Sequence, residues 1–146
     1  MKPLAAVIAA AFVAASAGTV SAASSQSPST YSSCGQYRTP PLKPTAWPLR
    51  ANRCILEARR RGRKARLVIV SVTVEGDPIV SYIFVRGPVF FPVLVVVDAT
   101  RDDFGPRVWT QRECRRMTGR AGSLEFGDCK AVRRGKPAWL KPIAIG

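Results

Sequence analysis

The sequence RLVIVSVTVE, residues 66–75, has the clearest β-strand pattern in the chain. Side chains alternate between the two faces of a strand, so this stretch presents Val68, Val70, Val72 and Val74 to one face and Leu67, Ile69, Ser71 and Thr73 to the other. Glu75-Gly76-Asp77-Pro78 follows, which is typical of a tight turn. The pattern therefore predicts an antiparallel sheet that is built outward from this strand.

Further strands are predicted on the C-terminal side of the turn. Residues 79–86 fit a returning strand and residues 89–98 fit the next one, in which Pro92 favours an edge position or a bulge. Residues 108–117 fit either a strand or a short helix. Residues 123–129 would return after a turn at residues 118–122.

A short helix is predicted on the N-terminal side of the first strand. Asn52 fits the N-cap of a helix over residues 53–61, and Gly62 fits its C′ position. Cys54, Ile55 and Ala58 recur at helical spacing and would form its apolar face. The sequence thus predicts an α+β domain, in which one short N-terminal helix packs on an antiparallel sheet of four to five strands.

The four cysteines are expected to form two disulfides. Cys34, Cys54, Cys114 and Cys129 include no C-x-x-C pair, and the chain has no histidine, so a zinc site or a redox pair is disfavoured. Three connectivities are possible. We favour Cys34–Cys54 and Cys114–Cys129, because these partners are nearest in sequence and most of the predicted strands lie between the two pairs.

Residues 1–22 have the features of a cleavable signal peptide. Lys2 supplies the positive charge, residues 4–13 are uncharged and mostly apolar, and Val20-Ser21-Ala22 places small residues at the cleavage site. We therefore expect a protein that is secreted or otherwise extracytoplasmic. The apolar stretch at residues 79–97 contains Arg86 and is broken by prolines, so no transmembrane segment is expected in the mature chain.

The mature chain is predicted to have three parts. Residues 23–33 are Ser-rich and fit a flexible leader, residues 34–129 would form the single disulfide-stabilised domain, and residues 130–146 would form a basic, Pro-containing tail. Within the domain, the prolines of residues 34–48 predict an extended, irregular segment that Trp47 would pin down. Only Trp139 and Leu140 could anchor the tail.

Several stretches carry a family resemblance. They are Cys54-Ile55-Leu56 with Gly62, Thr73-Val74-Glu75-Gly76-Asp77-Pro78-Ile79, Val97-Asp98 with Thr100-Arg101-Asp102 and Phe104-Gly105, Trp109 with Cys114, and Cys129. In these stretches the chain resembles an uncharacterised family of small exported actinobacterial proteins that has no assigned activity. The resemblance covers about residues 54–129, so it supports a single domain and implies no chemistry.

No catalytic, metal or cofactor site is predicted. The absence of histidine removes Ser-His-Asp and Cys-His catalysis and His-ligated metals. Glu75, Asp77 and Asp98 are the remaining carboxylates that a small hydrolase could use. Asp98 and Asp102 alternate with Thr100 as oxygen ligands of Ca²⁺ would, but the glycine and glutamate of a calcium loop are missing.

The strongest functional signal is the positive charge. The chain carries 23 basic and 9 acidic residues, a formal net charge of +14, and it contains three basic clusters in sequence. The candidate anion-binding residues of these clusters are Arg59, Arg60, Arg61, Arg63, Lys64 and Arg66, then Arg115 and Arg116 (with Arg112 and Arg120 nearby), then Arg133 and Arg134 (with Lys130 and Lys136 nearby). Such a surface attracts anionic partners.

We therefore expect a non-enzymatic binding module that associates with anionic cell-envelope or extracellular surfaces. Its partners would be wall polymers, lipid head groups or an acidic protein. The chain contains no nucleic-acid-binding motif, and export disfavours nucleic acid as the natural ligand. The alternative is a secreted inhibitor or effector that acts through the exposed loops at residues 86–92 or 99–106. A small carboxylate-dependent hydrolase is the third hypothesis.

Overall fold

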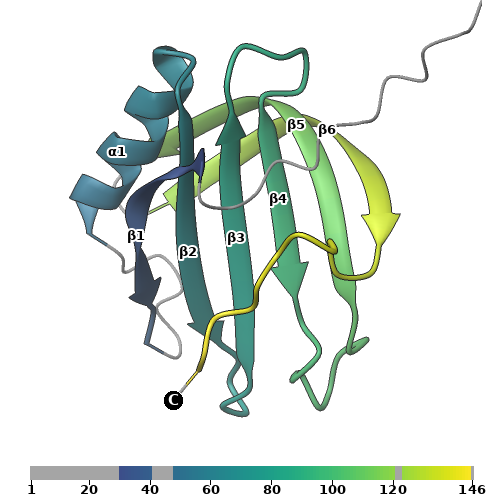
Figure 1. Cartoon of the computed structure of the whole chain (residues 1–146). Coiled ribbons are helices and arrows are strands. Elements are labelled where there is room, and N and C mark those ends of the chain that lie inside the picture. Colours follow the sequence, from purple (N-terminus) through teal and green to yellow (C-terminus); the bar gives the residue numbers. More distant parts are fainter. Residues whose placement is uncertain (1–29, 41–47, 121–122, 146) are drawn as a thin grey trace, which may run out of the picture.

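The computed structural model describes residues 30–40, 48–120 and 123–145, which form one helix and a six-stranded sheet (Figure 1). The elements are β1 (Ser32–Arg38), α1 (Leu49–Arg60), β2 (Lys64–Val72), β3 (Pro78–Arg86), β4 (Val93–Asp98), β5 (Trp109–Arg120) and β6 (Ser123–Arg134). The strands lie in the order β1-β2-β3-β4-β5-β6. The predicted α+β class is confirmed, whereas the prediction of four to five strands is wrong.

The sixth strand is β1, and it makes the sheet mixed. β1 pairs with β2 in parallel, with Tyr37 opposite Ile69, while all the other neighbouring strands are antiparallel. The parallel pair requires a crossover connection, and α1 lies in it. The helix is therefore not N-terminal in the fold. β1 includes Ser32 and Ser33, which we predicted to belong to the flexible leader. It also includes residues 34–38, which we predicted to belong to an irregular segment.

The helix begins earlier than the sequence pattern predicts. α1 starts at Leu49, after Pro48 in the N-cap position, so Asn52 lies inside the first turn and is not the N-cap. The buried Asn52 amide donates hydrogen bonds to the carbonyls of Arg120 (2.7 Å) and Ser123 (3.0 Å). The end of the helix is as predicted, since Gly62 has a φ of +61° just beyond it. The prediction about Trp47 lies outside the described residues.

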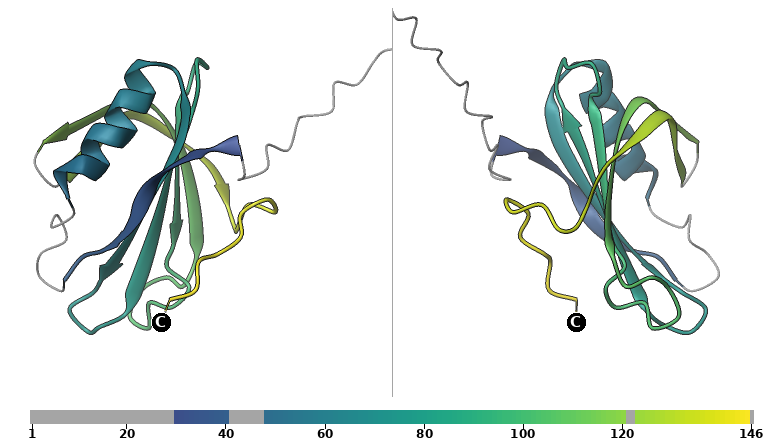
Figure 2. Two further views of the ribbon diagram at one scale, coloured as in Figure 1. Left: turned by 60° about the vertical axis from the view of Figure 1, so that its left-hand side comes forward. Right: turned by 90° about the vertical axis from the view of Figure 1, so that its right-hand side faces the viewer.

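One face of the sheet packs on α1 to form the main core. Figure 2 shows the distal part of the β5–β6 hairpin lying beside the helix on this side of the sheet. The buried side chains between these elements include Ile55, Ala58, Leu67, Ile83, Val85, Val93, Cys114 and Met117. Ile55, Leu67, Val85 and Val93 are fully buried. The two sets of alternating residues that we predicted for β2 thus face opposite sides of the sheet. Leu67 and Ile69 belong to this core, whereas Val68 and Val70 belong to the core on the opposite face.

Two disulfides join neighbouring elements, and both have the predicted partners. Cys34–Cys54 connects β1 to α1, and Cys114–Cys129 connects β5 to β6. The described residues contain no free cysteine. Paired disulfides indicate folding in an oxidising, extracytoplasmic environment. Within the described ranges, no helix is long and apolar enough to cross a membrane.

The second face of the sheet is covered by the C-terminal segment, residues 135–145, which lies on the side opposite α1 (Figure 2). Leu140 is 3% exposed, and the Trp139 ring meets Phe84 edge-on at 5.1 Å. The Ile143 N–H donates to the Tyr82 hydroxyl over 3.1 Å. Residues 130–145, which we predicted to form a basic tail beyond the domain, are therefore part of it. Residues 130–134 complete β6, and residues 135–145 cover a second apolar core.

Candidate functional site

Three segments that are far apart in sequence meet at one end of the sheet. They are the C-terminal end of α1, the start of β2 and the β3–β4 loop (residues 87–92), all at the top of Figure 1. A Cβ at Gly62 would lie 3.7 Å from the Pro88 Cβ, so the helix end contacts the loop. The Arg59 guanidinium donates to the Arg115 carbonyl over 3.3 Å, which adds β5 to the same end.

The β3–β4 loop contains apolar residues that we predicted to be part of a strand. The strand expected over residues 89–98 begins only at Val93, and the Arg86 N–H closes the loop by donating to the Pro92 carbonyl over 2.8 Å. Pro88 and Pro92 have no N–H to pair with a neighbouring strand, and Gly87 has a φ of +91°. Val89 is consequently 50% exposed and Phe90 is 69% exposed.

Basic side chains lie directly over the two aromatic rings of this loop. The Arg115 guanidinium carbon is 4.3 Å from the centre of the Phe90 ring, and the Lys130 Nζ is 4.2 Å from that of Phe91. The two phenyl rings meet edge-on at 5.0 Å. Cations stacked on aromatic rings are attracted by the ring quadrupole, so these contacts keep both the rings and the charges in place.

Basic residues greatly outnumber acidic ones at this end of the molecule, which we call the cationic end. Its nine basic residues are Arg59, Arg60, Arg61, Arg63, Lys64, Arg86, Arg115, Arg116 and Lys130, and its three acidic residues are Glu57, Glu113 and Asp128. The ion pairs are Glu57 with Arg60 and Arg61, Glu113 with Arg86 and Lys130, and Asp128 with Arg116. Among the described residues, Arg59, Arg63, Lys64 and Arg115 form no ion pair.

The structure brings together most, but not all, of the predicted anion-binding residues. Arg59, Arg60, Arg61, Arg63, Lys64, Arg115 and Arg116 belong to the cationic end, and Arg66 lies two residues farther along β2. Arg133 and Arg134 do not join them. They pair with Gln111 and Thr110, roughly 10 Å or more along β6 from Lys130. The sequence analysis named the loop at residues 86–92 only as a possible inhibitor loop, and it did not connect Phe90 and Phe91 with the basic residues.

Arg86 anchors the aromatic loop, and Glu113 holds Arg86. The Arg86 guanidinium donates to Glu113 Oε1 over 2.6 Å and also to the Phe91 carbonyl. The second Glu113 oxygen lies 3.3 Å from Lys130 Nζ. Burial alone would raise the pKa of Glu113, but the hydrogen bond and charge of Arg86, followed by those of Lys130, hold that pKa below its usual range. Glu113 is therefore an ionised structural partner of two site residues.

Replacing Glu113 by glutamine is expected to make stability less dependent on pH. Because the folded-state pKa of Glu113 is lowered, its ionised form stabilises the fold above the unfolded-state pKa, and this contribution is lost as the pH falls through the folded-state pKa. We expect Glu113→Gln to lower the free energy of unfolding by about 1–3 kcal/mol at pH 7 and by much less near pH 3. Urea unfolding at both pH values measures the difference.

Glu125→Gln is the matched control for this experiment. Glu125 is exposed and forms none of the ion pairs found in the described part of the chain, so its replacement should change the free energy of unfolding by less than about 0.5 kcal/mol. An equal loss of stability in Glu113→Gln at pH 7 and pH 3 would contradict the assigned role of the Glu113 carboxylate.

Five of the nine acidic residues lie at the opposite end of the sheet, in or beside the β2–β3 and β4–β5 connections at the bottom of Figure 1: Glu75, Asp77, Asp98, Asp102 and Asp103. Several of these carboxylates accept local hydrogen bonds. Asp98 accepts from the N–H and hydroxyl of Thr100, Asp102 accepts from two backbone N–H groups, and Asp77 accepts from the Asp103 N–H. These bonds order the loops. No group of three potential metal ligands is found in the described ranges.

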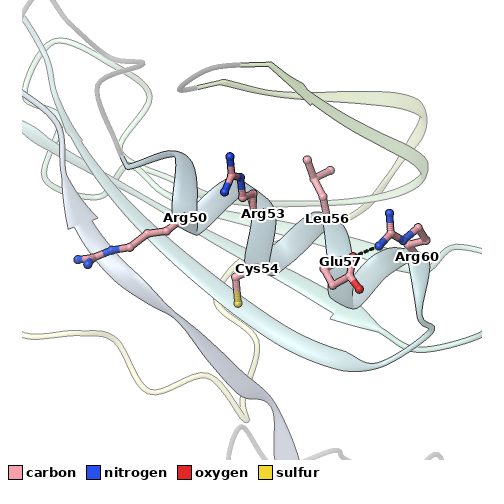
Figure 3. A pocket seen from close by; sticks show the side chains of 6 residues that line it. All are labelled: Arg50, Arg53, Cys54, Leu56, Glu57 and Arg60. Carbon is pink, nitrogen blue, oxygen red and sulfur yellow. Dashed lines mark hydrogen bonds and ion pairs between the residues drawn. The ribbon is translucent and has the colours of Figure 1, made fainter.

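A hollow on the outer side of α1 extends the basic surface away from the cationic end. It has a volume of about 680 Å³ and is lined by Arg50, Arg53, Cys54, Leu56, Glu57 and Arg60 (Figure 3). All six residues come from the same helix, and Arg60 is paired with Glu57. Arg50 and Arg53, which the sequence analysis did not name as anion-binding residues, are exposed here. They add positive charge beside Arg60 without enclosing a ligand site.

No protein-family model, curated protein or solved structure matches the chain. These comparisons therefore do not test the resemblance to small exported actinobacterial proteins, which remains an expectation.

Proposed function

We propose that this chain is an exported, non-enzymatic binding module that associates with anionic surfaces of the cell envelope through its cationic end. The observation that carries the proposal is the uneven distribution of charge along the sheet. At the cationic end nine basic residues outnumber three acidic ones, and four of the nine, Arg59, Arg63, Lys64 and Arg115, form no ion pair in the described structure. Five of the nine acidic residues lie in or beside the connections at the other end, which contain two basic residues, Arg101 and Arg107. This arrangement would orient the molecule with its cationic end toward a negatively charged surface.

The shape of the cationic end favours an extended partner over a small ligand. Its unpaired cations come from α1, from the α1–β2 connection and β2, and from β5, so they are spread over several elements and do not converge on one cavity. A polymer or surface with many negative groups can contact several of them at once, which multiplies weak individual contacts. The predicted signal peptide at residues 1–22 and the two disulfides support a location where envelope anions are accessible.

Salt dependence tests the proposal. The purified, disulfide-bonded protein is expected to bind isolated cell envelope at 50 mM salt and to lose roughly tenfold to a hundredfold in affinity by 200 mM, because about four cations would release counterions. Binding is measured by cosedimentation over the salt series. Binding that is strong and independent of salt would contradict an electrostatic contact, and absence of binding at low salt would remove the proposed function altogether.

A secreted inhibitor is the second candidate function, and the β3–β4 loop favours it. The loop exposes Phe90 and is held by Arg86 through the carbonyls of Phe91 and Pro92. Protease inhibitors present exposed loops that are fixed in this manner. The expected signature is stoichiometric inhibition of an extracellular peptidase that disappears when Phe90 is replaced, with little dependence on salt.

A further inference from the structure

We propose that the anionic partner is a lipid bilayer, and that Val89 and Phe90 enter its interfacial region while the surrounding cations bind anionic head groups. The inference rests on the proposed function and names its partner. A bilayer with anionic lipids offers negative charge at its surface and apolar chains directly beneath. The cationic end presents the complementary arrangement, with apolar side chains at the tip of a loop and basic side chains around them.

The apolar tip is the first element of the argument. Val89 and Phe90 are adjacent, and they are 50% and 69% exposed, although such side chains are normally buried. Phe104 and Val74 are also exposed, at 79% and 73%. They lie in the β4–β5 and β2–β3 connections, at the end of the sheet that carries Glu75, Asp77, Asp98, Asp102 and Asp103 and that we call the acidic end. Among the described residues, only the β3–β4 loop combines exposed, adjacent apolar residues with cations stacked on aromatic rings.

The positions of the cations are the second element. Arg115 and Lys130 lie over the faces of Phe90 and Phe91, so their charges flank the rings at distances of 4.3 and 4.2 Å from the ring centres. Long basic side chains can keep their charges at the head-group level while the neighbouring apolar groups go deeper. An anionic wall polymer would bind the same cations, but it has no apolar layer into which adjacent valine and phenylalanine side chains could be transferred from water. The exposed pair Val89 and Phe90 therefore favours lipid over polymer.

The conformation of the loop is the third element. Arg86 donates to the Phe91 carbonyl through its side chain and to the Pro92 carbonyl through its backbone, and Gly87 takes up the positive φ that the turn requires. The loop is consequently fixed before it meets a membrane, and little conformational entropy is lost on binding. The acidic β2–β3 and β4–β5 connections lie at the far end of the sheet, where they would point away from the anionic lipid.

Vesicle binding by the disulfide-bonded mature protein, without the predicted signal peptide at residues 1–22, tests this inference. We expect cosedimentation at 150 mM salt with vesicles of phosphatidylglycerol and phosphatidylcholine, but not with phosphatidylcholine alone. Phe90→Ser should weaken binding to the anionic vesicles roughly tenfold. Phe104→Ser removes a ring from the acidic end that is even more exposed than Phe90, and it should leave binding unchanged. Thermal unfolding of both variants verifies that the fold is intact.

Tryptophan fluorescence measures directly how deeply residue 90 enters the bilayer. In a Phe90→Trp variant, the added fluorescence relative to the native chain should shift to shorter wavelength on anionic vesicles and should be quenched by brominated lipid chains. Absence of both effects, or equal vesicle binding by Phe90→Ser and the native protein, would overturn membrane insertion. If salt-sensitive binding nevertheless persists in those variants, the proposed function stands on charge alone.

The remaining outcomes distinguish a lipid partner from a wall polymer and from a protein. Binding to lipid-free wall material together with no binding to anionic vesicles would overturn the inference in favour of a polymer. Binding to envelope that protease treatment abolishes would overturn it in favour of a protein. Failure to bind envelope, wall material and vesicles even at low salt would refute both the inference and the proposed function.

Discussion

Replacing Arg59, Arg63, Lys64 and Arg115 together by glutamate is expected to abolish binding to anionic envelope at physiological salt. These four residues form no ion pair within the described structure, so their charge is available to a partner. A basic residue close to an anionic surface contributes about 1 kcal/mol, so losing four would reduce affinity roughly 10³-fold, and repulsion by the new carboxylates would reduce it further. Cosedimentation with isolated envelope measures the loss.

A matched variant separates the position of the charge from its amount. Replacing Arg101, Arg133, Arg134 and Lys136 by glutamate changes the net charge equally, and all four side chains are exposed outside the cationic end. We expect this variant to retain most of the binding. If the two variants lost binding to the same degree, net charge alone would be responsible, and the cationic end would have no special role.

The second large effect is expected from Leu140→Ala, which should lower the free energy of unfolding by about 2–4 kcal/mol. Leu140 is 3% exposed in the core of the second face, where Trp139 also meets Phe84. Removing its side chain leaves a cavity between the C-terminal segment and the sheet. Denaturant unfolding, monitored by tryptophan fluorescence, measures the change.

Lys141→Ala is the control, because Lys141 is exposed beside the buried leucine and its replacement should change stability by less than about 0.5 kcal/mol. Equal stability of Leu140→Ala and the native protein would show that the C-terminal segment contributes no core.

The same structure indicates that deletion of residues 130–146 does not test the charge of this region by itself. Such a deletion would also remove part of β6 and expose the second face.

The central strands could be predicted from sequence because their pattern is local. The alternation in residues 66–75 and the turn at residues 75–78 identified β2 and β3 within a few residues of their observed bounds. β1 could not be recognised in this way. Its sequence, SSCGQYR, has few apolar residues, and its partner is reached only through the α1 crossover. The start of α1 was misplaced because Asn52 has the composition of a cap, whereas its amide is used in a distant contact with the β5–β6 hairpin.

The candidate site was predictable only in part, for a similar reason. The run from Arg59 to Lys64 is visible in the sequence, and a helix end followed directly by a strand keeps it together. Its meeting with Arg115 and Phe90 depends on the order and register of the strands, which no local pattern contains. Arg133 and Arg134 were grouped with Lys130 because they are close in sequence. In an extended strand, however, three or four residues are enough to separate charges by about 10 Å.

The position of the C-terminal segment also determines when the protein can finish folding. A polypeptide leaves the ribosome or a translocase with its N-terminus first, and residues 135–145 follow all six strands. Both disulfides can close earlier, since Cys129 precedes this segment. Until Leu140 and Trp139 emerge, the second face presents Tyr82, Phe84 and their aliphatic neighbours to water and to other nascent chains. The newly made protein is consequently most prone to aggregate between completion of β6 and arrival of its final segment.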